Sequence, residues 1–316
     1  GLSGLHAALQ LRSALPRATV RVLEARGRPG GRCYTLALPV GPAGTAALDV
    51  GPAWFWPGQR AMESLVQALG LGVFEQHDKG RGVYHSGQGV QVVRGGGGMP
   101  LSYRVRGGTG RLVDRLVEEL GEGTISLGCA VTRVSASPHD GPCRVEYMSS
   151  KTQAAGCLAC KCVIFAAPPR VLAESVTFDP PLPGSLAREM RDVGTWMAAS
   201  AKFFAIYDKP FWREAGLSGE GFSNEGPLGE VHDAGQEGGH GVLFGFFASG
   251  PEERRRLGRG ELEKRCIGQL AAMFGDRAAA PLATHLEDWA VGEAGADAEP
   301  WTCTPEDVRR PLKGHP

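Results

Sequence analysis

The chain has 316 residues, of which 42% are apolar and 22% are charged, so it can bury a sizeable core and is long enough for two domains. Its formal net charge is zero, which gives no electrostatic reason to expect nucleic acid or an anionic membrane surface as a partner. No run of apolar residues approaches the roughly 18 needed to span a membrane.

The N-terminal segment has the pattern of a dinucleotide-binding unit. Gly1 and Gly4 open an apolar helical stretch, and residues 20–26 predict a strand that ends near the carboxylate of Glu24. In such a unit, glycines let the pyrophosphate approach the backbone and let helix and strand pack closely. The helix N-terminus favours the phosphates, and the acid accepts hydrogen bonds from the ribose hydroxyls. A glycine-rich turn alone is weak evidence, because glycines also serve ordinary loops.

The residues after Glu24 strengthen this interpretation. Two adjacent glycines, Gly30 and Gly31, precede Arg32, which suits a backbone lying against a diphosphate that a guanidinium clamps. The alternative is a basic surface turn. Taken together, the segments 1–5, 22–26 and 29–32 resemble the flavin-binding N-terminal region of the FAD-dependent amine oxidase family, which includes monoamine and polyamine oxidases.

This resemblance implies an α/β fold: a Rossmann-like, glutathione-reductase-like FAD-binding domain with an interleaved α+β substrate domain. It implies that Glu24 holds the adenosine ribose and that Val131 contacts the adenine side through its backbone. The family also has an Asp-x-Gly-Gly-x-Trp-like segment beside the flavin ring, which residues 49–54 match, although Pro52 replaces a glycine and removes an N–H donor. The remaining implied cofactor-binding residues are Gly1, Ser3, Gly4, Ala25, Arg26, Gly31, Arg32, Gly51 and Trp54.

Apolar spacing predicts packing elements along the rest of the first half. Residues 61–69 and 112–120 predict amphipathic helices, and residues 74–102 predict short polar and glycine-rich pieces. Within these, Gly95–Gly98 predicts a loop, and no Lys-Ser/Thr follows it as in a phosphate-binding P-loop. Strands are predicted at residues 131–134, 143–148 and 163–167.

Cysteines give little reason to expect a metal. Of the eight, Cys157, Cys160 and Cys162 lie close in sequence, but zinc needs about four ligands and no second cluster with metal spacing appears. The apolar run after them predicts a buried strand, so small, easily buried thiols are the simpler account. Scattered spacing does not indicate a disulfide framework and mildly favours a reducing, intracellular compartment.

Lys202 is the candidate catalytic residue. It lies in the apolar stretch 201–207, where Lys202, Phe204 and Ile206 share one face of a strand. A buried lysine is costly without a partner, whereas a lysine at a strand end extends its ammonium group to solvent. The family has a lysine ten residues before the tryptophan of Pro-Phe-Trp, as here, and the resemblance implies that Lys202 holds a water against the flavin N5.

Later polar residues are interpreted as structural. His232 and Asp233 are adjacent in a predicted strand, residues 226–233, and so face opposite ways rather than forming an acid–base pair. A further strand is predicted at 241–247 and a packing helix at 261–274. A basic cluster predicts a solvated helical face: Arg254, Arg255, Arg256 and Arg259.

The resemblance divides the chain into an FAD-binding domain, residues 1–75 and 105–180, and a substrate domain, residues 76–104 and 181–316. Family members have a first strand before the matched region, normally central in the parallel sheet, and a later segment with a Gly-Thr-Glu motif and an aromatic pair. We therefore expect a polypeptide of these residues alone to hold FAD poorly and to be inactive.

Covalent attachment of FAD in this family needs a cysteine in the later segment. Cys303 is the nearest candidate but lies in a sequence that matches poorly, so noncovalent FAD is expected.

The implied activity of the complete protein is oxidation of a small-molecule amine to an imine, with O2 as acceptor and hydrogen peroxide (H2O2) as product. Two alternatives stay open. One is a related flavoenzyme such as a desaturase or a protoporphyrinogen-type oxidase, and the other is a noncatalytic, flavin-free derivative of the fold. The sequence identifies neither the amine nor the oligomeric state.

Overall fold

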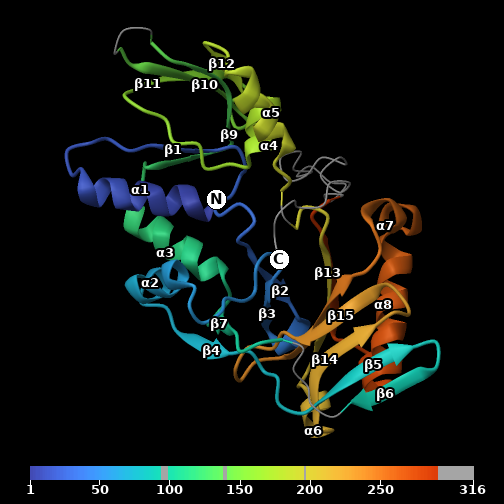
Figure 1. Ribbon diagram of the computed structural model, residues 1–316. Helices are drawn as coiled ribbons and strands as arrows, with labels where there is room; N and C mark the ends of the chain where they lie inside the picture. The colour runs from blue at the N-terminus through green and yellow to red at the C-terminus, as the bar shows by residue number, and fades with distance from the viewer. Residues whose placement is uncertain (94–98, 138–140, 196, 291–316) are drawn as a thin grey trace. The chain divides into compact units, whose positions relative to one another are not determined.

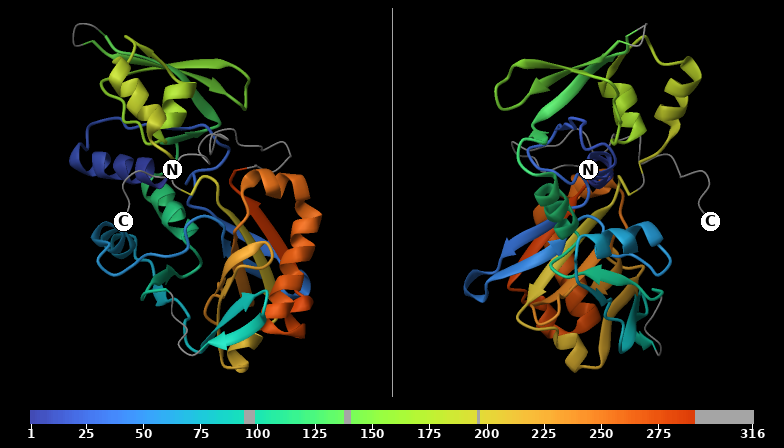
Figure 2. Two further views of the ribbon diagram at one scale, coloured as in Figure 1. Left: turned by 45° about the vertical axis from the view of Figure 1, so that its right-hand side comes forward. Right: turned by 90° about the vertical axis from the view of Figure 1, so that its left-hand side faces the viewer.

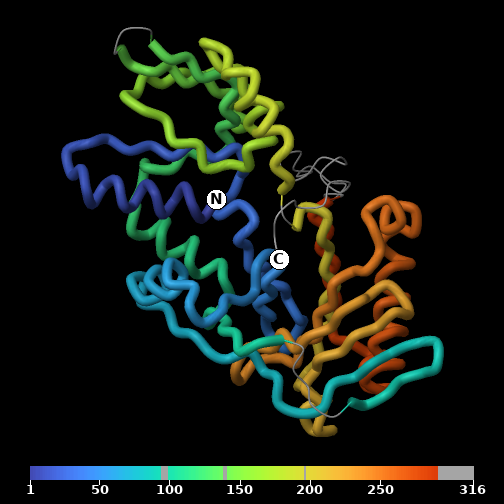
Figure 3. The backbone as a smooth tube through the Cα atoms, viewed as in Figure 1, coloured from blue at the N-terminus to red at the C-terminus, as the bar shows by residue number. Residues whose placement is uncertain are grey.

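The computed structural model describes residues 1–93, 99–137, 141–195 and 197–290. The predicted loop at Gly95–Gly98 and the residue Cys303 lie outside this part of the chain. The described residues form two compact units: one contains residues 1–33 and 112–195, and the other contains residues 34–111 and 197–290. The path of the chain from one unit to the other and back can be followed in Figure 3. Which unit serves the cofactor and which the substrate stays a prediction.

The first unit contains a parallel strand pair with helices before each strand. Helix α1 (Leu2–Ala14) precedes strand β1 (Val22–Glu24), and helix α3 (Gly110–Leu120) precedes strand β8 (Ile125–Leu127). β1 and β8 pair in parallel, as in a Rossmann sheet, where helices connect parallel strands. α3 buries the predicted apolar stripe: Leu112, Val113, Leu116 and Leu120.

The same unit also contains a four-stranded sheet with the order β11-β10-β9-β12 (Figure 1). β9, β10 and β11 are antiparallel, whereas β12 runs parallel to β9. A small apolar cluster of Val134, Val145 and Val176 packs in this region. The elements are β9 (Cys129–Ser135), β10 (Cys143–Ser149), β11 (Ala155–Cys160), β12 (Thr177–Asp179), α4 (Pro169–Ser175) and α5 (Gly184–Asp192).

The predicted buried strand at residues 163–167 is wrong. The strand in this region is β11, which ends at Cys160, and the following residues pair with no strand of the described chain. Ile164 and Phe165 are 57% and 42% exposed. A continuous apolar run predicts burial, but a strand also needs a neighbour for its backbone hydrogen bonds, and the run itself does not reveal one.

The second unit contains a seven-stranded sheet with the order β17-β13-β16-β15-β14-β5-β6. The β5–β6 hairpin lies where the sequence predicted only short polar pieces, and β5 pairs in parallel with β14. The strands are β5 (Arg81–Ser86), β6 (Gly89–Val93), β13 (Ala201–Tyr207), β14 (Leu217–Ser223), β15 (Leu228–Asp233), β16 (Gly241–Phe247) and β17 (Ala283–Asp288).

Both faces of this sheet are covered, which explains why every residue of β13 is buried. Phe203, on one face, packs in a core with Leu262 and Leu270 of helix α8 (Arg259–Phe274), and Figure 2 shows α8 alongside the sheet. Phe204, on the other face, packs with Leu48 of strand β3 (Thr45–Asp49). The predicted alternation along β13 is therefore confirmed.

Shorter elements complete the second unit. β2 pairs with β3, and β4 pairs with β7, each antiparallel. Helix α2 carries the predicted stripe, with Leu65 and Val66 buried. Their bounds are β2 (Thr35–Pro39), α2 (Arg60–Ala68), β4 (Val73–Glu75), β7 (Tyr103–Val105), α6 (Phe211–Glu214) and α7 (Pro251–Leu257), with short 3-10 helices at Gly41–Ala43 and Asp276–Ala279.

The predicted solvated arginine face is wrong for Arg254. This side chain is 3% exposed, and its Nε and Nη2 donate to the two carboxylate oxygens of Asp288 at 2.7 and 2.9 Å. Nη2 also donates to the carbonyl of Ala199 at 2.8 Å. The rest of the cluster is exposed. Local spacing could not reveal this because the partner carboxylate lies 34 residues away in the chain.

Candidate cofactor and catalytic site

Glu24 ends β1 beside the N-terminus of α1. Its Oε2 lies 3.3 Å from the amino nitrogen of Gly1, and its Oε1 accepts a hydrogen bond from the backbone N–H of Arg26 at 3.1 Å. The side chain remains 16% exposed. A carboxylate is thus held next to a helix N-terminus with part of its surface accessible, which is the arrangement that a ribose and its neighbouring phosphates require.

The paired-glycine turn meets the same N-terminus. Gly31 has a φ of +59°, and a Cβ at this position would lie 3.2 Å from the Cα of Gly1, so a larger residue would crowd the backbone. The same Cβ would lie 3.9 Å from Nη1 of Arg26, whose side chain is buried. Two backbone segments and a cation therefore converge beside Glu24, and this donor set fits a pyrophosphate.

Gly4 packs α1 tightly within the first unit, because a Cβ on it would lie 3.1 Å from the Cβ of Ala166. The other predicted residues of this unit lie around the same elements. Ser3 is exposed on α1, Ala25 is half-buried after β1, Arg32 is exposed in the turn and Val131 is half-buried in β9. Their contacts with a cofactor stay predictions.

Lys202 occupies the second position of β13 and is 5% exposed. Its Nζ donates hydrogen bonds to the carbonyl oxygens of Asp49 at 3.0 Å and Gly51 at 2.6 Å. The same Nζ lies 4.9 and 5.3 Å from the ring centroids of Phe244 and Phe246, where a cation is favoured. The lysine is therefore internal, and the alternative of a strand-end lysine that reaches solvent is excluded.

Burial lowers the pKa of Lys202 from its ordinary value of 10.5 to about 7. The positive charge of Arg104 lowers this pKa further, whereas the negative charge of Asp49 opposes the shift. A lysine with this pKa changes charge near neutral pH, which is a property typical of residues that hold or move protons.

Arg104, which no sequence motif marks as a site residue, forms a buried ion pair with Asp49. Arg104 Nη2 lies 3.6 Å from Asp49 Oδ2, and both side chains are nearly inaccessible. Asp49 also accepts hydrogen bonds from the hydroxyl of Thr35 at 2.6 Å and the N–H of Thr109 at 2.8 Å. The only available signal for Arg104 was its place between apolar residues in a short strand, which many surface arginines share.

Trp54 joins an aromatic wall beside Lys202. We define this wall as Trp54, His232, Phe244 and Phe246. The Trp54 ring centroid lies 5.1 Å from that of His232 and 5.3 Å from that of Phe244. The indole N–H donates to the side-chain oxygen of Gln76 at 2.8 Å, which fixes the ring. Among the predicted residues, the second unit therefore brings Gly51, Trp54 and Lys202 together.

His232 and Asp233 have separate structural roles, as predicted. His232 is part of the aromatic wall, and its Nε2 lies 2.7 Å from Oε1 of Glu230. Asp233 accepts hydrogen bonds from the indole of Trp212 at 2.8 Å and from Nε of Arg213 at 2.7 Å. These two side chains therefore do not form an acid–base pair.

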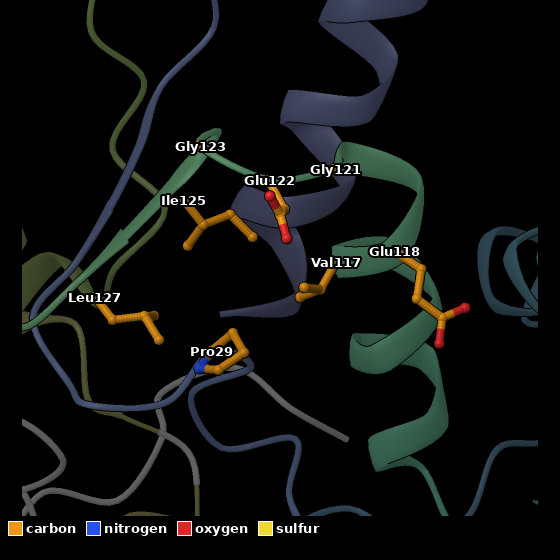
Figure 4. A pocket seen from close by; sticks show the side chains of 8 residues that line it. All are labelled: Pro29, Val117, Glu118, Gly121, Glu122, Gly123, Ile125 and Leu127. Carbon is orange, nitrogen blue, oxygen red and sulfur yellow. The ribbon is translucent and has the colours of Figure 1, made fainter.

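A pocket of 380 Å³ in the first unit is lined by residues other than the predicted cofactor-binding ones. Figure 4 shows it between α3 and β8, with Val117, Ile125 and Leu127 on its walls.

Within the part of the chain that the structure describes, no group of three or more His, Cys, Asp or Glu side chains could hold a metal ion. Among the described helices, none combines the length and apolar composition needed to cross a bilayer.

Comparison with known proteins decides the family. Residues 2–96 and 86–312 match the family of flavin containing amine oxidoreductases. The chain belongs to this family. It is 31% identical over 193 residues to an L-amino acid dehydrogenase of Synechocystis sp., covering 60% of this chain and 38% of that protein. It is 29% identical over 216 residues to the putrescine oxidase of Kocuria rosea, covering 64% of this chain and 41% of that protein.

The fold is also that of a flavin containing amine oxidoreductase. A solved structure of putrescine oxidase bound to putrescine matches with a TM-score of 0.79 at 24% identity, covering 96% of this chain and 84% of that one. The predicted fold class is therefore confirmed. The chain spans about two fifths of the length of the two curated relatives above.

Proposed function

We propose that the protein containing this chain is an FAD-dependent amine oxidase, which converts an amine to an imine and passes the electrons to dioxygen, giving hydrogen peroxide. The observation that carries this proposal is the state of Lys202. A buried lysine with a pKa of about 7 donates to the backbone of the segment that resembles the family's flavin-ring segment. A lysine with only a packing role would not have to lie beside this segment.

The first unit fits the dinucleotide part of FAD. Glu24 would accept hydrogen bonds from the adenosine ribose, and the N-terminus of α1 would hold the pyrophosphate. Gly31 would allow the pyrophosphate to approach the backbone closely, and Arg26 would balance the phosphate charge. When bound, FAD supplies the acceptor for hydride from the amine and the means to reduce dioxygen.

Lys202 contributes through a water molecule and a proton. Near pH 7 the amine of Lys202 is partly neutral, so it can accept as well as donate a hydrogen bond and can hold a water at the reacting centre. The aromatic wall keeps this region apolar and excludes bulk water. The substrate must enter as the free base, because its nitrogen lone pair is needed for imine formation.

The position of Glu230 favours a substrate that carries a second positive charge. Lys202 is opposite Phe246, which is opposite Glu230 on the next strand, so the three side chains share one face of the sheet. With strands about 4.8 Å apart, Glu230 lies about 10 Å from Lys202 across the sheet. Its side chain is 44% exposed and available to a cationic group. A diamine such as putrescine, the substrate in one relative's name, has this form.

A second candidate follows from the similarity to an L-amino acid dehydrogenase. The same oxidation of a C–N bond would then pass electrons to an acceptor other than dioxygen. The residues described above serve both reactions, since they act on the amine and the cofactor. The acceptor is therefore a separate question for experiment.

The test uses the complete protein that contains this chain. We expect it to bind FAD, to release peroxide with at least one member of a panel of diamines, monoamines and L-amino acids, and to need no added acceptor. Activity only with an artificial dye acceptor would favour the dehydrogenase. A colourless protein that refuses added FAD would overturn both and favour the noncatalytic alternative.

The role of Lys202 is tested by Lys202→Met, with Lys209→Met as control, because Lys209 is exposed beyond the end of β13. Stopped-flow absorbance should show slower flavin reduction or reoxidation in Lys202→Met, with FAD affinity unchanged. Unaltered rates in both half-reactions would remove the role proposed for Lys202.

A further inference from the structure

Three thiols lie at one end of the four-stranded sheet of the first unit. Cys143 begins β10 and Cys160 ends β11, and the two residues are directly opposite each other in the antiparallel pair. Cys162 follows two residues later, beyond the end of β11. Figure 1 shows β10 and β11 side by side, as their pairing requires. No part of the proposed reaction uses these residues.

The register selects one pair among the three thiols. Directly opposed residues of antiparallel strands have Cα atoms about 4.5–5.5 Å apart with side chains on the same face, within the roughly 4.4–6.8 Å that a disulfide spans. Cys157 alternates to the other face and is opposite Glu146. Since Cys162 is outside the strand pair, the sheet holds only Cys143 and Cys160 in a bridging register among the described cysteines.

The surroundings distinguish the two thiols of this pair. A pocket of 450 Å³ is lined by Cys143 and Cys162, together with Val163, Phe165 and Phe178. Cys160 instead packs against the apolar cluster of the sheet. Burial, with contributions from the neighbouring thiols, raises the pKa of Cys160. Cys143 is therefore accessible from the pocket, whereas Cys160 packs against the apolar cluster and stays protonated near neutral pH.

We propose that Cys143 and Cys160 are an oxidative modification site, a dithiol that peroxide converts to a cross-strand disulfide. Peroxide transfers one oxygen to the sulfur of Cys143, which becomes a sulfenic acid while water is released. Cys160 then loses its proton and its thiolate sulfur attacks the sulfur of Cys143, so that the S–S bond forms as the S–O bond breaks. The departing hydroxide takes up the proton from Cys160 and leaves as the second water. Two thiols lose two electrons, and one peroxide is reduced to two waters.

Peroxide is also the product of the proposed function, so the protein would meet this oxidant where it is made. The modification itself needs only peroxide and not turnover. Peroxide added to the protein without amine therefore tests the dithiol independently, and a failure of the amine oxidase proposal would leave this result unchanged.

The experiment is peptide mapping of the full chain after treatment with hydrogen peroxide and alkylation of the remaining thiols. Trypsin separates the thiols because Lys161 lies between Cys160 and Cys162. Cys143 falls in the peptide 134–144, Cys160 in 152–161 and Cys162 in 162–170. We expect a disulfide-linked pair of 134–144 with 152–161, with the loss of two hydrogen masses, that disappears on reduction.

Cys157→Ser is the matched control, because Cys157 shares a peptide and a strand with Cys160 but is exposed on the opposite face. The linked pair should persist in Cys157→Ser and vanish in Cys160→Ser. Chain unfolded in urea should give mixed linkages instead. In the folded parent chain, two results would each overturn the proposal: a link from 134–144 to 162–170, or overoxidised cysteines without any link.

Discussion

Nζ of Lys202 lies 2.6 Å from the carbonyl oxygen of Gly51, so the seven-stranded sheet and the segment after β3 meet at one buried amine. The second carbonyl at this amine belongs to Asp49, whose carboxylate is instead held by Thr35, Thr109 and Arg104. Among the residues that the structure describes, the lysine thus donates to carbonyl oxygens and no carboxylate is hydrogen-bonded to it. For this reason burial dominates its pKa.

The titration of Lys202 should appear in the pH dependence of stability. Its pKa is about 7 when folded and about 10.4 when unfolded. Between these values the unfolded chain binds a proton that the folded chain does not, so this group makes stability rise with pH, by up to about 1.4 kcal/mol per pH unit. Below the folded pKa the lysine is protonated in both states, so it no longer contributes to the pH dependence of the unfolding free energy.

Lys202→Met should therefore flatten the rise in unfolding free energy above pH 7, and Lys209→Met should not. Urea unfolding at several pH values, with all variants in the same flavin state, measures this slope. Equal slopes in the parent and Lys202→Met would mean that the lysine is not buried as described.

Arg104→Met should both destabilise the protein and raise the pKa of Lys202. The change leaves Asp49 as a buried carboxylate without its ionic partner, which costs about 3–5 kcal/mol. It also removes a positive charge that lowers the pKa of the lysine. Arg106→Met is the control, because Arg106 is 54% exposed two residues along the chain. Urea unfolding measures the stability loss, and the onset of the pH-dependent slope should move upward only in Arg104→Met.

Glu24→Gln should weaken FAD binding. A hydrogen bond to a charged group contributes about 1.5–3 kcal/mol, so the Kd for FAD should rise about 10- to 150-fold. Titration of flavin fluorescence quenching gives this constant. Glu122→Gln, an exposed change in the same unit, should leave it unchanged. Equal affinities for the parent and Glu24→Gln would mean that Glu24 does not bind the ribose.

Arg254→Met should lower the unfolding free energy by about 3–5 kcal/mol, because it leaves the carboxylate of Asp288 partly buried without its bidentate partner. Arg255→Met should have an effect within about 0.5 kcal/mol, as expected for an exposed side chain. Comparison of the urea midpoints decides this. Similar losses in both variants would show that Arg254 is no more important than its solvated neighbours.

Glu230→Gln should reduce preference for diamines over monoamines. The hydrogen bond from His232 lowers the pKa of Glu230, so its carboxylate is charged near neutral pH. A partly exposed ion pair contributes about 1 kcal/mol, so kcat/KM for putrescine should fall about fivefold. The value for a monoamine of similar length should stay constant, as should both values in the exposed variant Glu253→Gln. A parallel fall for both amines would indicate a structural effect instead.

Much of the fold followed from local patterns. Apolar periodicity predicted α2, α3, α8 and both faces of β13, because burying one stripe or one face is a local requirement on side-chain spacing. It failed at residues 163–167, where the run is apolar enough for a strand but finds no backbone partner among the described residues. Hydrogen-bond partners come from elsewhere in the chain, and no local pattern contains them.

The sequence by itself determined the family, through Gly1, Glu24, the paired glycines and the place of Lys202 before Pro-Phe-Trp, since these residues carry their chemistry in their type and order. Only the tertiary structure decided which charges are buried together. Asp49 lies 55 positions from Arg104, and Arg254 lies 34 from Asp288, and their pairing depends on strands that meet in space. Burial then sets the electrostatics of Lys202, because the energy of a charge depends on what surrounds it rather than on its neighbours in the chain.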